Sequence, residues 1–319
     1  MRIGVVGATG EVGRMMLTCL GEQQVEIDEL VLFASQKSAG TTVYFQGKKI
    51  VVQELTEDKM RHKYDYLLFS AGSTVSKHYA PIASQAGNTV IDNSSAFRQD
   101  PRIPLVIPEI NGAKLDNYQG IIANPNCSTI QMLLPLYPIH RKNRIKKIIV
   151  STYQSVSGSG NKGIESLLSH DEKTIYPRKI NNNVIPLIGT LLPSGYSDEE
   201  EKMSFETHKI FNDKNIQISA TAVRVPVLYG HSESVYIEMA YSYKLDLIKE
   251  LLKSSPGVKY LEDDYITPLE LGDSNASYVC RLRRGVDDFS LTFWNVANNI
   301  RVGAATNAVR ILKYLIDRD

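Results

Sequence analysis

Hydrophobic residues in the first third of the chain follow two alternating patterns, short continuous runs and helically spaced positions. The continuous runs lie at 2–6, 30–33, 64–69 and 89–91, whereas residues 74–85 have helical spacing. Short apolar runs are typical of buried strands, and strands that alternate with helices form parallel βαβ units. We therefore expect an α/β fold with a parallel sheet, whose strands end where ligands usually bind.

From about residue 146 the pattern becomes that of a second domain of the α+β class. Residues 169–197 have weak periodicity and several prolines, which predicts an irregular connection. Strand-like and helix-like segments follow one another without regular alternation. The expected strands are 148–154, 216–223, 235–239 and 290–296, and the expected helices are 198–212, 245–252 and 302–316.

A glycine-rich turn joins the first strand to the first helix. Its sequence is Gly7-Ala8-Thr9-Gly10-Glu11-Val12-Gly13. Gly7 would permit a tight turn, Gly10 would let the backbone approach a pyrophosphate, and Gly13 would let the helix pack closely. The spacing is a variant of the usual dinucleotide fingerprint, and a purely structural turn would look similar. We predict a dinucleotide site at the N-terminus of this helix.

The loop after the second strand lacks the carboxylate that binds the ribose of NAD. It reads Ala34-Ser35-Gln36-Lys37-Ser38. Hydroxyl groups and a lysine can hold a 2′-phosphate, which a carboxylate would repel, so the loop predicts NADP instead of NAD. An ordinary solvated lysine at position 37 is the alternative. The segment Ser70-Ala71-Gly72 ends the next strand and is expected near the same cofactor.

Cys127 lies where a cysteine thiolate would be stabilised. In Asn124-Pro125-Asn126-Cys127-Ser128-Thr129, Asn126 is a candidate N-cap, and the apolar helical pattern begins immediately afterwards. The N-terminus of a helix favours an anion, so a cysteine in its first turn is a good nucleophile. An ordinary buried cysteine that begins a helix would give the same local pattern.

Polar residues of the second domain cluster at the ends of its expected strands. Gln154 ends one strand and is followed by a Gly-rich loop, while Arg224 and His231 flank a short Gly-His loop at 229–234. Arg224 and His231 can therefore reach one cleft, although a single histidine is more often structural. In the helix at 198–212, charges spaced by three and four residues, Glu199 and Lys202 among them, are typical of a solvated helix surface.

Composition limits the classes of function. The length of 319 residues suggests two domains, and 36 basic against 35 acidic side chains give no reason to expect a nucleic-acid or membrane partner. The three cysteines, Cys19, Cys127 and Cys280, are widely spaced, which suits a reducing compartment. No zinc-ligand spacing occurs, and no apolar run is long enough to span a membrane. We expect a cytoplasmic protein without a metal.

The chain contains seven ordered blocks that can be compared with known families. The blocks are 7–13, 94–98, 106–111, 124–129, 151–158, 199–203, and 224–227 with 231–234. Together they resemble the aspartate-β-semialdehyde dehydrogenase family over essentially the whole chain. The resemblance implies a Rossmann-type dinucleotide-binding domain at 1–127 with 301–319, and a catalytic and dimerisation domain at 128–300.

The resemblance implies NADPH-dependent reductive dephosphorylation of β-aspartyl phosphate to aspartate semialdehyde, on the route to lysine, threonine and methionine. By position, Cys127 would be the nucleophile, His231 the acid/base, and Gln154 the residue that orients the acyl-enzyme. The implied substrate residues are Arg224 for the α-carboxylate, Glu199 near the amino group, and Arg98, Asn126 and Lys202 for phosphate. The implied cofactor residues are Gly7, Thr9, Gly10, Glu11, Val12, Gly13, Ser35, Lys37, Ser38, Ser70, Ala71, Gly72, Ser157, Gly158 and Asn299. The family implies a homodimer.

Two other functions stay open at this point. N-acetyl-glutamyl-phosphate reductase performs the same chemistry on a longer acyl phosphate, although its cysteine block differs. A catalytically silent paralogue would keep the fold for binding alone, but such proteins usually lose the cysteine or the histidine. The family commonly has arginine where Lys37 stands, so binding of the 2′-phosphate would lose a bidentate contact and NADP selectivity would be less strict.

Overall fold

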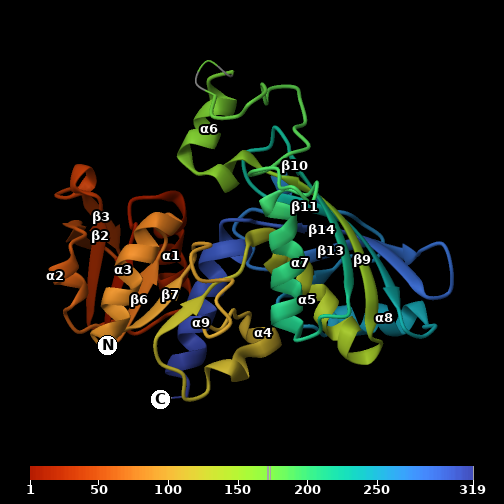
Figure 1. Cartoon of the computed structure of the whole chain (residues 1–319), viewed down its shortest axis with the longest axis horizontal. Helices are drawn as coiled ribbons and strands as arrows, with labels where there is room; N and C mark the ends of the chain where they lie inside the picture. Colours follow the sequence, from red (N-terminus) through yellow and green to blue (C-terminus); the bar gives the residue numbers. More distant parts are fainter. Residues whose placement is uncertain (171, 173, 319) are drawn as a thin grey trace. The chain divides into compact units, whose positions relative to one another are not determined.

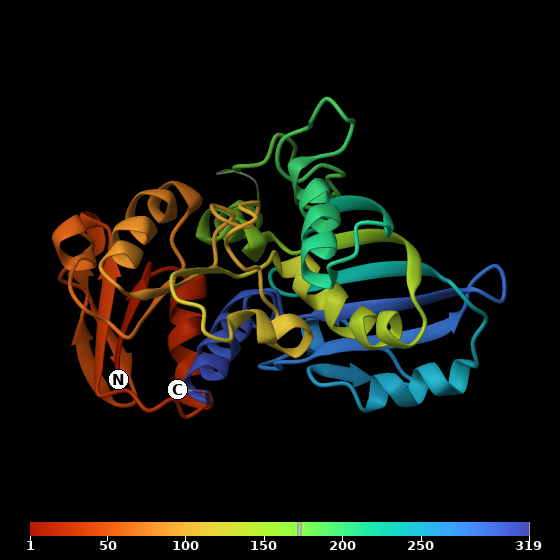
Figure 2. The ribbon, with the colours of Figure 1, turned by 60° about the horizontal axis from the view of Figure 1, so that its bottom comes forward.

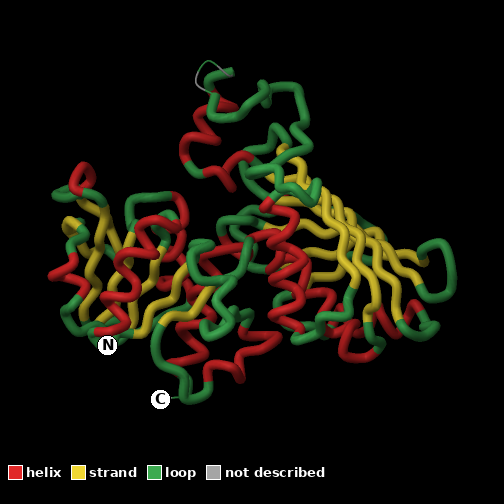
Figure 3. The backbone as a smooth tube through the Cα atoms, viewed as in Figure 1, coloured by secondary structure: helices red, strands yellow, loops and turns green. Residues whose placement is uncertain are grey.

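The computed structural model describes residues 1–170, 172 and 174–318. The chain forms two compact units, Met1–Pro125 with Ala304–Asp319, and Asn126–Gly303. The first segment of unit 1 ends at Pro125, two residues before the predicted end at 127. Its second segment begins at Ala304, three residues after the predicted start at 301. Each unit is built around a six-stranded sheet. Figure 3 shows the strands of both units in yellow.

The first unit has a parallel sheet in the order β5-β2-β1-β6-β7-β8. The order reverses between β1 and β6, which is the point at which ligands bind in such folds. The strands are β1 (Arg2–Val6), β2 (Glu29–Ala34), β5 (Gln53–Glu54), β6 (Tyr66–Phe69), β7 (Thr89–Asp92) and β8 (Ile121–Ala123), with a hairpin of β3 (Thr42–Phe45) and β4 (Lys48–Val51). The helices are α1 (Glu11–Glu22), α2 (Glu57–Met60), α3 (Ser73–Gln85), α4 (Pro108–Asn111) and α9 (Thr306–Ile316).

Alternate strand residues of this sheet enter two separate hydrophobic cores. Val5 and Leu68 pack in the core that contains α1 and α9, whereas Val6 and Leu67 pack in the core that contains α3. Figure 2 shows α9 beside α1 although the two helices come from opposite ends of the chain. Because both faces are covered, the strands read as continuous apolar runs.

The second unit has a mixed sheet in the order β10-β9-β11-β14-β13-β12. Helix α5 contacts β9, β11, β13 and β14, while α7 contacts β10 and α8 contacts β12 and β13 (Figure 1). The strands are β9 (Ile145–Gln154), β10 (Gln217–Arg224), β11 (His231–Met239), β12 (Val258–Tyr260), β13 (Ser277–Arg284) and β14 (Ser290–Ala297). The helices are α5 (Cys127–Lys142), α6 (Asn161–Leu168), α7 (Asp198–Phe211) and α8 (Leu245–Lys253).

The α/β fold class and the second, mixed-sheet domain agree with the sequence prediction, but some elements differ. Residues 231–234 are part of β11, not of a loop, because both β9 and β14 pair with them. The last helix begins at Thr306 instead of 302, after a π-helical turn at Arg301–Ala305. Among its described residues, the connection at 169–197 has neither helix nor strand, and residues 171 and 173 lie outside the description.

No helix in the described ranges is both long and apolar enough to cross a membrane. Within the same ranges, His, Cys, Asp and Glu side chains form no group of three or more that could hold a metal ion.

Candidate active site

Three strands of the second unit present predicted site residues at one edge of the sheet. Gln154 and Arg224 are the last residues of β9 and β10, and they are register partners in this parallel pair. Strand β11 runs antiparallel to β9 and begins at His231, whose neighbour Ser232 pairs with Tyr153. Strand register therefore brings Gln154, Arg224 and His231 to the same place.

His231 is fully buried, and its two ring nitrogens have different environments. The backbone N–H of Ser155 donates to Nδ1 at 3.0 Å. The neutral ring therefore carries its hydrogen on Nε2, which has no hydrogen-bond partner within the described part of the chain. Burial and, secondarily, the charge of Arg224 lower the pKa of His231 well below its ordinary value. The ring is thus neutral, with one N–H available to a ligand.

Arg224 lies beside this ring and is also buried, with 5% of its surface exposed. Its Nη1 donates to the carbonyl oxygen of Ser155 at 2.6 Å, and its Nε has no partner among the described residues. A Cβ placed on Gly158 would lie 3.1 Å from Arg224 Nη1 and 3.3 Å from His231 Cε1. Any residue larger than glycine at 158 would therefore press on both side chains.

Cys127 is the first residue of α5, because Asn126 caps that helix. The side-chain oxygen of Asn126 accepts hydrogen bonds from the backbone N–H groups of Ser128 and Thr129, at 2.9 and 3.4 Å. This places the Cys127 sulfur at the positive end of a 16-residue helix. A Cβ on Gly303 would lie only 2.5 Å from the Cβ of Cys127, so the backbone at Gly303 packs directly against this cysteine.

Gln131 connects the cysteine helix to the histidine strand. It lies four residues after Cys127, and residues at this spacing share one face of a helix. Its Nε2 donates to the carbonyl oxygen of His231 at 3.3 Å and to Asn295 Oδ1 at 3.0 Å. The face of α5 that carries Cys127 is therefore anchored to the residue that begins β11.

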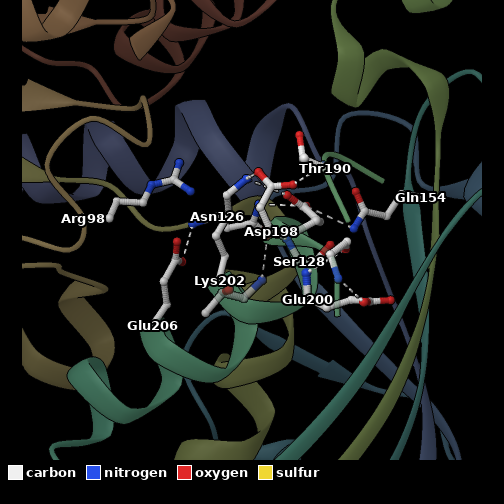
Figure 4. Close-up of polar contacts among 12 residues, drawn as sticks. Arg98, Asn126, Ser128, Gln154, Thr190, Asp198, Glu200, Lys202 and Glu206 are labelled. Carbon is white, nitrogen blue, oxygen red and sulfur yellow. Dashed lines mark hydrogen bonds and ion pairs between the residues drawn. The ribbon is translucent and has the colours of Figure 1, made fainter. Parts of the chain in front are cut away.

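Helix α7 supplies acidic side chains that hold the residues around Cys127. Glu199 is buried, and its Oε1 accepts hydrogen bonds from Asn126 Nδ2 at 2.9 Å and Gln154 Nε2 at 3.2 Å. Glu206 Oε2 accepts from the backbone N–H of Asn126 at 2.7 Å (Figure 4). Two carboxylates thus fix the N-cap, and one of them also fixes Gln154.

Lys202 is held on α7 by the two carboxylates that precede it by one helical turn. Its Nζ lies 3.1 Å from Asp198 Oδ2 and 3.2 Å from Glu199 Oε2 (Figure 4). Burial lowers the pKa of Lys202, but the charges of Glu199 and Asp198 outweigh burial and leave that pKa raised. The ion pairs that the spacing predicts exist, but Glu199 is buried in the site instead of lying on a solvated surface.

Asn299 is buried among the loops that follow β9 and precede β11. Its Oδ1 accepts from the backbone N–H of Gly230 at 2.8 Å and from the hydroxyls of Ser155 and Ser157 at 3.2 and 3.3 Å. Its Nδ2 donates to Ser157 Oγ at 3.0 Å. The polar atoms of Asn299 are therefore used within the protein, where they tie the 155–159 loop to the turn before His231.

In the first unit the glycine-rich turn has the geometry of a phosphate loop. Gly7 has a φ of +82°, which favours glycine, and a Cβ on Gly13 would lie 2.2 Å from the carbonyl oxygen of Gly7. Gly10 is the N-cap of α1 and provides no capping side chain. Thr9, Glu11 and Val12 complete the turn and the first helical residues. The N–H groups of the first turn of α1 therefore lack a side-chain cap.

The other predicted cofactor residues of this unit lie at the same strand ends. Ser70 follows β6, and its hydroxyl donates to the carbonyl oxygens of Val6 and Gly7, at 3.0 and 3.2 Å, before Ala71 and Gly72 lead into α3. Ser35 and Lys37 are exposed after β2, and Ser38 is half-buried. Arg98 is buried after β7 and donates to the carbonyl oxygen of Asn93 at 2.9 Å.

The chain matches known proteins along its whole length. Residues 2–118 match the family model of the semialdehyde dehydrogenase NAD binding domain, and residues 136–302 match that of the semialdehyde dehydrogenase dimerisation domain. The aspartate-semialdehyde dehydrogenase of Aquifex aeolicus is 44% identical, covering 99% of this chain and 98% of that protein.

The chain belongs to the aspartate-semialdehyde dehydrogenase family.

Other members are equally complete matches. The enzyme of Bacillus subtilis is 43% identical, covering 99% of this chain and 97% of that protein. A crystal structure of aspartate semialdehyde dehydrogenase II from Vibrio cholerae, complexed with ASA, has a TM-score of 0.95 at 42% identity, covering 99% and 98% of the two chains. The fold of this chain is therefore that of the family, including its NAD-binding and dimerisation domains.

Membership of the family did not reveal which residues position the site. Ser155, Glu206 and Gly303 contact the histidine, the N-cap and the cysteine, yet the sequence analysis assigned none of them a role in the site. Ser155 contacts His231 through its backbone N–H. The pattern of side chains in a sequence does not predict a backbone hydrogen bond of this kind. Glu206 has the three- and four-residue charge spacing of α7, so only its burial distinguishes it from a solvated residue.

Proposed function

We propose that the chain catalyses the reversible, NADPH-dependent reductive dephosphorylation of β-aspartyl phosphate to L-aspartate 4-semialdehyde, in the biosynthesis of lysine, threonine and methionine. The observation that carries the proposal is the capped helix N-terminus at Cys127, joined through Gln131 to the strand that begins at His231. The names of relatives that match the entire chain at 42–44% identity support the substrate.

The proposed chemistry begins with attack by the Cys127 thiolate on the acyl carbon of the substrate. Phosphate leaves with the electron pair of the broken C–O bond, and a thioacyl-enzyme forms. The family resemblance implies that His231 is the general acid/base, which transfers protons to and from the intermediate and the thiol. In the geometry described above, its Nε2–H would donate to the oxyanion of each tetrahedral intermediate. Once a hydride has been added to the thioester carbon, return of the oxyanion electrons expels the thiolate and releases the aldehyde.

The remaining polar residues would bind and orient the substrate. Arg224 would hold the α-carboxylate, and Gln154, which Glu199 fixes by a hydrogen bond, would orient the acyl group. Glu199 would also face the substrate amino group, because a carboxylate attracts an ammonium. The proposed phosphate residues, Lys202, Asn126 and Arg98, supply cationic and amide donors for an anion.

The first unit fits a dinucleotide, because Gly7 and Gly13 allow a tight turn and close helix packing where a Cβ would clash with backbone, and the N-terminus of α1 has no side-chain cap. When bound, the nicotinamide supplies the hydride that reduces the thioester. Residues 9–12 would hold the pyrophosphate, and Ser35, Lys37 and Ser38 the 2′-phosphate. Ser70, Ala71 and Gly72 would line the same strand ends, and Ser157, Gly158 and Asn299 would lie toward the nicotinamide. We infer a preference for NADP because β2 ends in Ala34 instead of a carboxylate.

A homodimer is supported by one face of the second sheet as well as by the match to a dimerisation domain. Alternate residues on this face, Ile149, Tyr153, Tyr236 and Trp294, are only half-buried or exposed. The rings of Tyr153 and Trp294 lie 5.3 Å apart, and Ile149 is 46% exposed. An apolar face of this kind would be covered by a second copy, and Ile149→Asp should then convert the dimer to a monomer in light scattering. We also propose a cytoplasmic location, because three widely spaced cysteines suit a compartment where thiols stay reduced.

The activity test is the phosphate-dependent reduction of NADP by aspartate semialdehyde, run beside N-acetyl-glutamate semialdehyde and with NAD in place of NADP. We expect turnover with aspartate semialdehyde only, and loss of turnover after alkylation of the half-buried Cys127 thiol. Cys280→Ala is the matched control, because Cys280 is fully buried in β13, and this variant should stay active and sensitive to alkylation. Preference for the longer aldehyde, or activity that survives complete alkylation, would refute the proposal.

A further inference from the structure

A buried polar cluster lies beneath the proposed active site, and the proposed reaction does not use it directly. Glu233 on β11 is fully buried between its register partners, Thr152 on β9 and Asn295 on β14. Gln131 reaches this row from α5. Neither oxygen of Glu233 accepts a hydrogen bond within the described part of the chain, and the same holds for Gln131 Oε1.

The hydrogen atoms of this cluster can be assigned from fixed backbone groups. Asn295 Nδ2 donates to the carbonyl oxygen of Tyr278 at 2.9 Å and to Ser277 Oγ at 2.6 Å, so Asn295 Oδ1 faces Gln131. Gln131 Nε2 then donates both its hydrogens, one to Asn295 Oδ1 and one to the carbonyl oxygen of His231. Rotating either amide by 180° would point an oxygen at a backbone carbonyl oxygen. Oε1 is therefore the polar atom of the Gln131 side chain that can still form a hydrogen bond with Glu233.

Gln131 is bonded to Asn295, the register partner of Glu233, so Gln131 Oε1 and the Glu233 carboxyl group are unpartnered oxygens of the same buried cluster within the described residues. Two acceptor oxygens repel unless a hydrogen lies between them, and Gln131 Oε1 cannot carry one. We propose that Glu233 is a neutral carboxylic acid that donates its hydrogen to Gln131 Oε1. This bond makes Glu233 a positioning residue, because it completes the set of contacts by which Gln131 joins the Cys127 helix to His231.

The surroundings of Glu233 favour the neutral form. Burial raises the pKa of Glu233 well above its ordinary value. The side chains that face it from β9, β14 and α5, namely Thr152, Asn295 and Gln131, carry no charge. The nearest titratable residue on its own strand, His231, is itself neutral. Among the described residues, none of these neighbours is a cation that would stabilise a carboxylate.

The first test is the infrared carbonyl stretch of a protonated carboxyl group near neutral pH. We expect this band in the parent protein and its loss in Glu233→Gln. Glu238→Gln is the matched control, since Glu238 lies on the same strand but is ion-paired with Lys147 and should contribute no such band. A parent spectrum without the band, or one in which the band survives Glu233→Gln, would overturn the proposal.

The second test uses turnover, and it rests on the proposed function. Glu233→Gln keeps a donor for Gln131 Oε1, so kcat should stay within about twofold of the parent. Glu233→Leu removes the donor, and a shift of the cysteine helix by about 1 Å would lower kcat by about 10²-fold. Equal loss in both variants would mean that an ionised Glu233 is needed. An infrared band without activity on either aldehyde would refute the proposed function and leave the proton assignment standing.

Discussion

Substitution of Gly303 by alanine tests how tightly the fold positions Cys127. The added methyl carbon would lie 2.5 Å from Cys127 Cβ and 2.8 Å from its Cα, whereas ordinary contact begins at 3.4 Å. The cysteine or the backbone at 303 must therefore move by about 0.9 Å. A misplacement of about 1 Å in a reacting group costs about 10²-fold in rate, and overpacking of this kind destabilises a fold by about 1–3 kcal/mol.

The assay for Gly303→Ala is kcat/KM for phosphate-dependent aldehyde oxidation, combined with urea unfolding and the rate of Cys127 alkylation. We expect kcat/KM to fall by about 10²-fold and the alkylation rate to change, with NADPH affinity retained. Gly21→Ala is the control. Its methyl group would lie 3.9 Å from the nearest atom, the Phe45 ring, so this change in α1 should leave activity unchanged. A Gly303→Ala enzyme with parental activity would contradict the prediction that this contact positions Cys127.

Three further changes test individual groups. Cys127→Ala should abolish turnover and leave NADPH binding intact, as measured by fluorescence titration, and activity within tenfold of the parent would contradict the nucleophile assignment. Arg224→Lys should raise KM for the amino-acid substrate more than KM for NADP, because lysine cannot form the bidentate contact to a carboxylate, and an equal rise in both would count against the clamp. The lowered pKa of His231 means that the unfolded chain binds a proton at this site that the folded chain does not. The stability it contributes is complete above about pH 6.5, the ordinary histidine pKa, and is lost as pH falls below it, at about 1.4 kcal/mol per pH unit. His231→Asn should remove this part of the slope in urea unfolding between pH 4.5 and 6.5, and an unchanged slope would show that His231 is not buried in its neutral form.

Features with a local cause were predictable from the sequence. Asn126 as N-cap and Cys127 as the first helical residue follow from interactions among residues within one helical turn, and the structure has both. The glycine-rich turn is also local, since only glycine fits the φ of +82° at Gly7 and the close approach at Gly13. The continuous apolar runs predicted a parallel sheet correctly. Helices cover both faces of such a sheet, so successive strand residues on either face are buried and apolar.

The prediction of a loop at residues 231–234 was wrong because the second sheet contains buried polar residues. Residues 231–234 resemble a loop because all four are polar or titratable. In the structure they belong to a central strand, where Glu233 and Asn295 are paired by register and both are fully buried. A polarity pattern cannot reveal whether a distant partner will satisfy a buried group, so it predicts exposure by default.

The amino-acid sequence predicts Cys127 as the nucleophile and residues 7–13 as a glycine turn, and its seven ordered blocks indicate the family of this protein. How the candidate site residues are held depends on contacts made in the folded structure. Strand register aligned Gln154 with Arg224, α7 brought Glu199 and Glu206 to the N-cap, and Gly303 packed against Cys127. The physical reason is the range of the interactions. Caps and turns depend on residues a few positions apart, whereas hydrogen-bond assignments and burial depend on segments that meet only after the chain has folded.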